Sequence, residues 1–243
     1  MLTGSKQCLQ FSCILWNKVF LLGSKMKFIA QVISIIFHPL LMLTYMLLLM
    51  LMVNPYMFGY NEISDADTLI MMVFLTSVLI PVIAILVMKA IGWVHSLEMS
   101  DRHERIGPYL VTSILYLSLY LHFAKAKSFP PPLLIATLGA VIALFTGFFL
   151  NNFRKISIHA IAIGGFLALT IHLYRSYSTD QFILPLPFLY DLRISTVFLV
   201  YVVILLAGLV CSARLMTGQH TSSEVFVGFM IGVLSMSMSY LIL

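Results

Sequence analysis

The sequence has 243 residues, of which 61% are hydrophobic and only 9% are charged, with a formal net charge of +5. Soluble domains carry about 25% charged residues, so this composition excludes an ordinary soluble enzyme, and it also excludes a disordered chain or a nucleic-acid-binding arm. Three scattered cysteines exclude a disulfide scaffold. The remaining class is a polytopic membrane protein.

The N-terminal leader, residues 1–27, is poorly suited to be a membrane span. Its apolar stretch at 9–22 is short and contains Asn and Lys. No small-residue cleavage site follows it, which argues against a cleaved signal peptide. We hypothesise that Met26 is the native start and that the residues before it are not part of the protein. Residues 28–243 are expected to form a single transmembrane domain.

Seven charge-free runs, each of at least 19 residues, follow in the order 28–61, 68–88, 106–124, 128–153, 156–174, 194–213 and 225–243. About 20 helical residues cross roughly 30 Å of hydrocarbon, and a backbone in lipid must satisfy its own hydrogen bonds. Period-2 alternation, the mark of a transmembrane barrel, is absent. The sequence therefore predicts an all-α fold, a polytopic transmembrane helical bundle of about seven spans.

Two of these runs contain residues that affect helix geometry or packing. Pro81 is expected to kink the second span, because proline interrupts helical hydrogen bonding. Gly228 and Gly232 form a small-xxx-small pair in the last span, where another helix can approach closely. The proline and the glycine pair thus predict how these two helices bend and pack.

Ionisable residues gather in three clusters, at 98–108, 154–159 and 214–224. Two spans separate the first cluster from the second, and two more separate the second from the third. An even number of crossings returns the chain to the same membrane face, so the clusters are expected to converge there. Because an ionisable group near the membrane core is costly, such a convergence is a candidate functional site.

The cations of these clusters are suited to phosphate. Arg102, Arg105 and Arg214 would come together, with Lys155 nearby, and arginine forks match phosphate oxygens in pairs. Ser157 occupies the N-cap position of the fifth span, where a helix offers free N–H groups and a positive dipole to an anion. Considered singly, each of these residues also has a plainer interpretation, as an interface charge or a helix cap.

Two histidines accompany the cations. His159 and His220 could act as nucleophile and proton donor, and Glu224 could hold the His220 imidazole in one tautomer. A rival role for this glutamate is structural, because Thr221-x-x-Glu224 matches a capping box. The absence of an acidic pair and of a Gly-rich loop argues against a kinase. We expect no metal and no cofactor.

These residues resemble the motifs of the type 2 phosphatidic acid phosphatase superfamily, which also includes vanadium haloperoxidases. The family pattern is Lys-x6-Arg-Pro, then Pro-Ser-Gly-His, then Ser-Arg-x5-His-x3-Asp. The third motif is matched in spacing by Ala213-Arg214-x5-His220-x3-Glu224. The second is kept in Ser157 and His159.

The chain also departs from the family pattern. The first motif reads Arg105-Ile-Gly-Pro108, with Glu98 where the family has lysine. Ile158 replaces the glycine of the second motif, and Glu224 replaces the aspartate of the third. A helix pair also lies between the first two motifs, where the family commonly has a loop.

The resemblance implies a role for each matched residue. His220 would attack phosphorus, His159 would protonate the leaving oxygen, and Glu224 would orient His220. The phosphate oxygens would be held by Arg105, Arg214, Ser157 and, in place of the missing lysine, Arg102.

The sequence thus predicts a membrane-embedded, metal-independent phosphatase that hydrolyses a lipid-linked phosphate or diphosphate through a phosphohistidine. The expected partners are a lipid phosphate or prenyl (di)phosphate and the lipid bilayer, with no nucleic acid. Four alternatives stay open: a lipid phosphotransferase, a non-catalytic anion or lipid transporter, a degenerate family member, and a zinc hydrolase with His159, His220 and Glu224 as ligands.

We expect an integral multi-pass protein of the cell (inner) membrane. With seven spans, the face that carries the motifs holds ten Lys and Arg residues and the other face four. This bias favours a cytoplasmic site. The family resemblance implies an extracytoplasmic site, which is the orientation that we expect.

Overall fold

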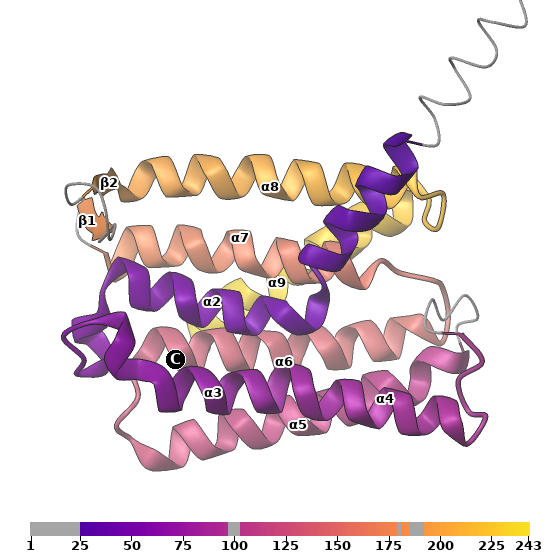
Figure 1. The fold of residues 1–243 in the computed structure, drawn as a ribbon, viewed down its shortest axis with the longest axis horizontal. Coiled ribbons are helices and arrows are strands. Elements are labelled where there is room, and N and C mark those ends of the chain that lie inside the picture. The colour runs from indigo at the N-terminus through magenta and orange to yellow at the C-terminus, as the bar shows by residue number, and fades with distance from the viewer. Residues whose placement is uncertain (1–24, 97–102, 179–180, 185–191) are drawn as a thin grey trace, which may run out of the picture.

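The computed structural model describes residues 25–96, 103–178, 181–184 and 192–243. The described chain is almost entirely helical, and six of its helices are long and apolar enough to cross a membrane, or seven if a bent pair counts as one span. The predicted fold class is therefore confirmed (Figure 1). The leader lies outside the described residues up to residue 24, and so does the predicted phosphate ligand Arg102.

A helical segment at Lys25–Ile36 opens the described chain. The helices after it are α2 (Pro39–Val53), η1 (Pro55–Phe58), η2 (Ile63–Ala66), α3 (Asp67–Phe74), η3 (Leu75–Leu79), α4 (Ile80–Ala90), η4 (His103–Arg105), α5 (Ile106–Ala126), α6 (Pro131–Asn151), α7 (Ile158–Ser176), α8 (Thr196–Met216) and α9 (Ser222–Ile242). Strands β1 (Gln181–Leu184) and β2 (Leu192–Ser195) pair antiparallel before α8.

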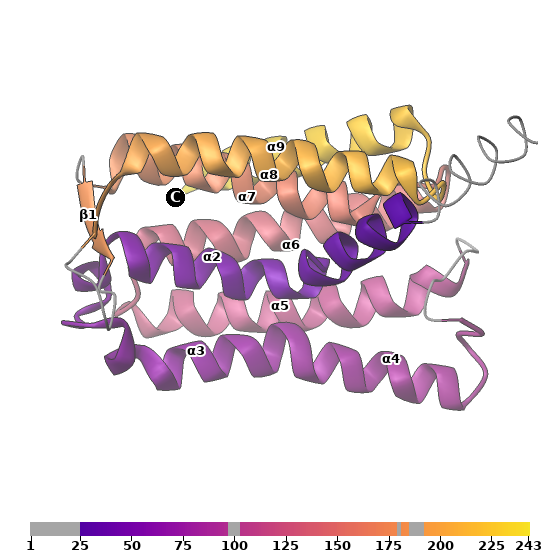
Figure 2. The same ribbon diagram turned by 45° about the horizontal axis from the view of Figure 1, so that its top comes forward.

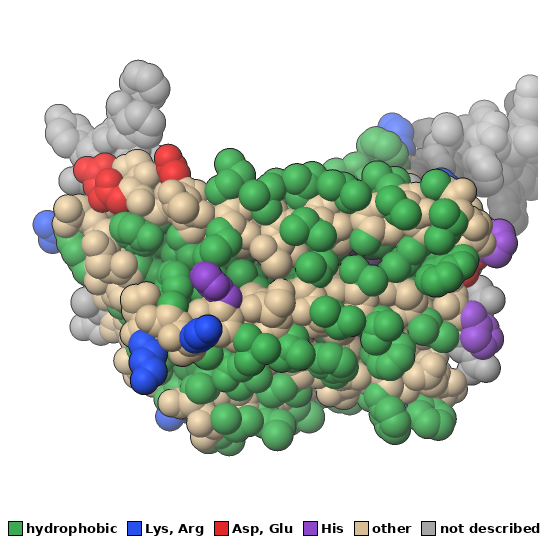
Figure 3. All heavy atoms as spheres, turned by 90° about the horizontal axis from the view of Figure 1, so that it is seen from below, with side chains coloured by type: hydrophobic (Ala, Val, Ile, Leu, Met, Phe, Trp, Pro, Cys, Tyr) green, Lys and Arg blue, Asp and Glu red, His purple; other side chains and the backbone are tan. Residues whose placement is uncertain are grey.

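The long helices run side by side, with α7 near the middle of the bundle. Helix α7 packs against α8 and α9, α9 also packs against α6, and α6 packs against α5. Helices α3 and α4 form the outer edge beside α5 (Figure 2). Hydrophobic side chains cover the middle of the face seen in Figure 3, and charged side chains lie toward its ends. This distribution is that of a surface surrounded by lipid.

The first predicted span, 28–61, is not one straight helix. Lys25–Ile36 and α2 meet at an angle of 59°. Pro39 explains the break, because a proline disfavours helical geometry in the residue before it and is favoured in the first turn of a new helix. His38, in the extended conformation, caps α2 by accepting the Leu40 N–H at Nδ1, 3.3 Å away. Pro55 ends α2 in the same way, so this helix stops at Val53.

Pro81 is accommodated in a helix that includes a π-helical turn, η3, just before it. Proline has no N–H to donate to the carbonyl of Ser77, four residues earlier. The Tyr116 hydroxyl lies 3.5 Å from that carbonyl oxygen and 3.5 Å from the carbonyl oxygen of Leu40. The Ser77 hydroxyl is 3.2 Å from that of Thr44. The proline thus creates a polar junction that joins α2, η3 and α5.

The close approach predicted for Gly228 and Gly232 is confirmed. A Cβ at Gly232 would overlap the carbonyl oxygen of Ile161, and a Cβ at Gly228 would lie 2.7 Å from the carbonyl oxygen of Ser157. These contacts bring the backbones of α9 and α7 together without side chains between them. The start of α9 is thereby held against the start of α7, where the second and third motifs lie.

Candidate active site

The described parts of the three polar clusters lie at one end of the bundle. The first residues of α5, α7 and α9 and the last turn of α8 meet there, at the right of Figure 1. This is the arrangement that the even number of predicted spans between the clusters requires. The topology therefore places His159 and His220 on the same side of the bilayer.

One cavity of about 200 Å³ opens among these helix ends. Its lining includes four residues predicted from the sequence, each from a different element: Arg105, His159, Arg214 and His220. Three of them are nearly fully buried, with 9% of His159, 7% of Arg214 and 8% of His220 exposed. Burying an arginine beside two imidazoles is costly unless an anion can share the site, so this lining favours an anionic ligand.

Glu224 contacts His220 and also caps α9. Its Oε2 lies 2.9 Å from His220 Nδ1 and accepts the Thr221 N–H at 3.3 Å, while Thr221 Oγ1 accepts the Glu224 N–H at 3.4 Å. The capping box and the orienting contact, which were alternatives in the sequence, are therefore both present. A carboxylate at Nδ1 favours the tautomer with its proton there, which leaves the lone pair of His220 on Nε2.

The surroundings of His220 keep its imidazole neutral. Burial, together with the positive charges of Arg214, Lys155 and Arg105, lowers the pKa of His220 to about 4, against the opposing effect of its hydrogen bond with Glu224. Burial and the nearby Arg105 also lower the pKa of Lys155. At neutral pH, His220 therefore carries a free lone pair, which a nucleophile requires.

Arg214 is held by two fixed acceptors. Its Nη1 donates to Ser34 Oγ at 3.2 Å and its Nη2 to Gln219 Oε1 at 2.5 Å. The Ser34 hydroxyl in turn donates to the carbonyl oxygen of Ala30 at 2.9 Å. Arg214 Nε is buried and has no hydrogen-bond partner among the described residues. The guanidinium is thus oriented by neutral groups, and no carboxylate of the described residues forms an ion pair with it.

The beginning of α7 lies against this cavity. Arg105 Nη1 donates to the carbonyl oxygen of Ile156 at 3.4 Å, which joins α5 to this turn. Ser157 is the N-cap residue, as predicted, but its side chain makes no capping hydrogen bond. Within the described part of the chain, its fully buried Oγ has no partner. Ser157 itself does not line the cavity, but Ile158 and His159, next to it, do.

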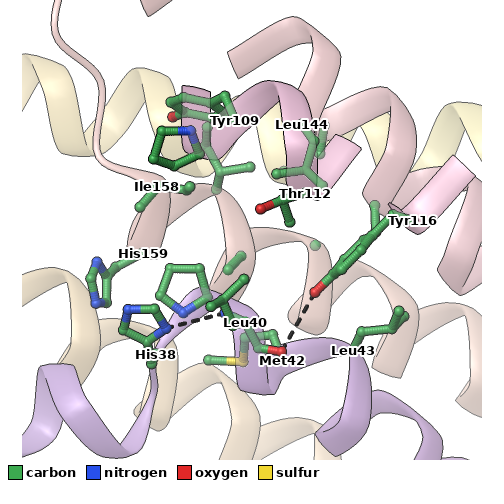
Figure 4. Close-up of a pocket in the computed structure, with 18 of the residues that line it drawn as sticks. His38, Leu40, Met42, Leu43, Tyr109, Thr112, Tyr116, Leu144, Ile158 and His159 are labelled. Atoms are coloured by element: carbon green, nitrogen blue, oxygen red, sulfur yellow. Dashed lines mark hydrogen bonds between the residues drawn. The ribbon is translucent and has the colours of Figure 1, made fainter. Parts of the chain in front are cut away.

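His159 is oriented through one ring nitrogen. Its Nε2 donates to the carbonyl oxygen of Ser34 at 3.1 Å. The buried Nδ1 has no hydrogen-bond partner among the residues that the structure describes. His38 packs edge-on against this ring, with 5.6 Å between centroids, and the two rings lie together at one end of the cavity (Figure 4). A proton that His159 delivers would therefore reside on Nδ1.

Ser34 and His38 also belong to the site, although neither was predicted from the sequence. They lie four residues apart inside a run that was predicted to be an ordinary span, and they reach the site because that span bends at Pro39. Ser34 contacts both His159 and Arg214, and His38 lines the cavity. The sequence feature that could have indicated them is a pair of polar residues shortly before Pro39, within an otherwise apolar run.

Two cations of the second cluster lie away from this lining. Lys155 is half-buried, and its neighbour Arg154 is exposed and donates to Ser223 Oγ at 2.9 Å. No group of three His, Cys, Asp or Glu side chains within the described ranges is placed to share a metal ion. The ligand set of the zinc alternative, with His159, His220 and Glu224, therefore has no geometric support in the described part of the chain.

No protein-family model matches this sequence, and searches of curated proteins and of solved structures find no similar chain.

Proposed function

We propose that this protein is a membrane phosphatase that hydrolyses a lipid-linked phosphate or diphosphate through a phosphohistidine on His220. The observation that carries the proposal is the lining of one cavity by two histidines and two arginines, with Glu224 behind His220. The motif spacing that resembles the type 2 phosphatidic acid phosphatase superfamily supports it. We further propose the cell membrane as its location, with the site on the extracytoplasmic face.

The first chemical step transfers the phosphoryl group to the protein. The lone pair on His220 Nε2 attacks phosphorus, and the bond between phosphorus and the lipid oxygen breaks. The bound phosphate anion stabilises His159 as an imidazolium with a proton on each ring nitrogen. The leaving oxygen takes the proton on Nδ1, so the lipid departs as a neutral alcohol, or as a monophosphate if the substrate is a diphosphate. Glu224 stabilises the positive charge that develops on the His220 ring.

The second step restores the protein. Water attacks the phosphohistidine and gives a proton to His159, now neutral, while the bond between phosphorus and His220 Nε2 breaks. Inorganic phosphate leaves, and both histidines return to their starting forms. An acceptor alcohol in place of water would make the same site a phosphotransferase.

Charge stabilisation is the main contribution expected from the arginines. Negative charge on the transferring group is shared by its equatorial oxygens, and fixed cations stabilise it without reorganisation. Arg214 is already oriented by Ser34 and Gln219, and Arg105 is tied to the carbonyl oxygen of Ile156. The start of α7, at Ser157, adds a helix N-terminus to the same region.

The decisive experiment is phosphate release from lipid phosphates by the purified protein in detergent. We expect turnover that persists in excess chelator and is inhibited by vanadate, which adopts the five-coordinate geometry of the transferring phosphoryl group. A transporter would bind vanadate without turnover, and a zinc enzyme would lose activity in chelator. Failure to release phosphate from any member of a panel of lipid mono- and diphosphates would overturn the proposal.

The pH dependence should report the low pKa of His220. Only the neutral imidazole attacks, so kcat/KM should rise with pH through about 4, well below the ordinary histidine value of about 6.5. Replacing Lys155 with glutamine removes a positive charge that lowers this pKa, so the break should move to higher pH. The pH profiles of kcat/KM for the wild type and for Lys155→Gln are measured with the same substrate. Ionisation of the substrate then affects both profiles equally and cannot account for a difference between them. A break near 6.5 that does not respond to Lys155→Gln would contradict this assignment.

A further inference from the structure

The cavity does not end at the polar residues. It continues into the bundle among α2, α5, α6, α7 and α9, where its lining is mostly apolar, with hydroxyl groups from Tyr109, Thr112 and Tyr116 on α5. Figure 4 shows His38 and His159 at one end and Leu43, Tyr116 and Leu144 toward the other. The space exists because small residues line α6 and α7 there, namely Gly139, Ala140, Ala143 and Gly165.

We propose that this apolar chamber binds the first carbons of the hydrocarbon chain of the substrate, while the phosphate lies between the arginines and histidines. The proposal rests on the proposed function and makes it more specific: the lipid enters the bundle by its head and the first part of its tail. The rest of the tail stays in the bilayer.

The character of the lining favours a hydrocarbon occupant. An apolar cavity of about 150 Å³ stays dry and accepts a small hydrocarbon, and the whole cavity here, with its polar end included, measures about 200 Å³. The Tyr116 hydroxyl is directed to backbone carbonyl oxygens and adds little polarity. Met42, Met46 and Met236 supply flexible walls that can adapt to the shape of a chain.

For a membrane lipid, the chamber should discriminate between hydrocarbon chains by their shape and should add little to the binding affinity. Bilayer hydrocarbon is as apolar as the lining, so moving a tail between them changes the hydrophobic free energy little. A short alkyl phosphate dissolved in water is different. Each methylene that enters the chamber from water contributes about 0.8 kcal/mol, which is about a fourfold gain in affinity.

The test uses n-alkyl monophosphates of increasing length, kept below micelle-forming concentrations, as substrates for the full-length protein in detergent. We expect KM to fall about fourfold for each added methylene and then to level off when the chamber is full. A KM that is independent of chain length, with methyl phosphate still hydrolysed and vanadate still inhibiting, would overturn the chamber while leaving the phosphatase intact. Loss of hydrolysis and of vanadate inhibition across the series would instead overturn the proposed function.

A matched pair of variants localises the effect. A Cβ at Gly165 would make ordinary contacts, at 3.6 Å from the Met236 side chain, so Gly165→Ala fits while narrowing the chamber. A Cβ at Gly208, an exposed position on α8, would meet nothing within 4 Å. We expect Gly165→Ala to level off at a shorter chain and Gly208→Ala to match the wild type. Identical series for the two variants would place the chain elsewhere, and if Gly165→Ala does not fold, the wild-type series still decides.

Discussion

Replacing His220 with alanine should reduce phosphate release by roughly 10⁴-fold or more, because the step that forms the phosphohistidine loses its nucleophile. The binding of vanadate should weaken far less, since Arg105 and Arg214 remain in the cavity lining. The measurements are steady-state phosphate release, and vanadate affinity from thermal stabilisation of the purified protein. A rapid-quench experiment with labelled substrate should trap acid-labile, base-stable phosphate on the wild type only.

His122→Ala is the matched control for this change. His122 is exposed on α5 and does not line the cavity, so its loss should leave phosphate release within about twofold of the wild type. Retention of substantial release by His220→Ala, or label on a different residue, would remove the catalytic assignment and would favour a role in binding or transport.

Replacing Arg214 with lysine should lower kcat/KM by about 10- to 100-fold, because charge-assisted hydrogen bonds contribute about 1.5–3 kcal/mol each. The charge is kept, but the fork that donates to Ser34 and Gln219 while presenting Nε is lost. Vanadate affinity should fall by a similar factor, because the same donor geometry serves the ligand and the transition state. Both are measured on protein that elutes as a single species from size-exclusion chromatography.

Arg154→Lys provides the control at the same end of the bundle. Arg154 is exposed and donates to Ser223, outside the cavity lining. We expect little change in kcat/KM for this variant, so a general effect of exchanging arginine for lysine at this end of the bundle cannot account for the result at Arg214. Equal effects of the two substitutions would show that the loss at Arg214 does not depend on the hydrogen bonds that its guanidinium makes at the cavity.

The fold class could be predicted because the bilayer imposes it: charge-free runs long enough to span must become helices. The convergence of His159, Arg214 and His220 followed from counting spans, which depends on topology and not on details of packing. The contact between Glu224 and His220 followed from spacing. These inferences needed only the positions of polar residues relative to apolar runs.

The residues that the first span contributes to the candidate site could not be predicted from the positions of polar residues along the sequence. Ser34 and His38 precede α2, whereas all three motifs follow α4, and no spacing rule links them. Their approach depends on the size of the bend at Pro39 and on how α2 packs against α7, which are tertiary properties. The apolar chamber was hidden for the same reason, because it depends on which small residues face one another.

The single carboxylate oxygen that serves both Thr221 and His220 links two processes that are usually separate. Initiation of α9 and alignment of the imidazole become one event, because the turn cannot unwind without releasing the ring. A longer arm than aspartate allows one group to reach both partners. A ligand that strengthens the hydrogen bond between Glu224 and His220 must therefore also stabilise the first turn of α9. Conversely, fraying of that turn would abolish activity before the bundle itself unfolds.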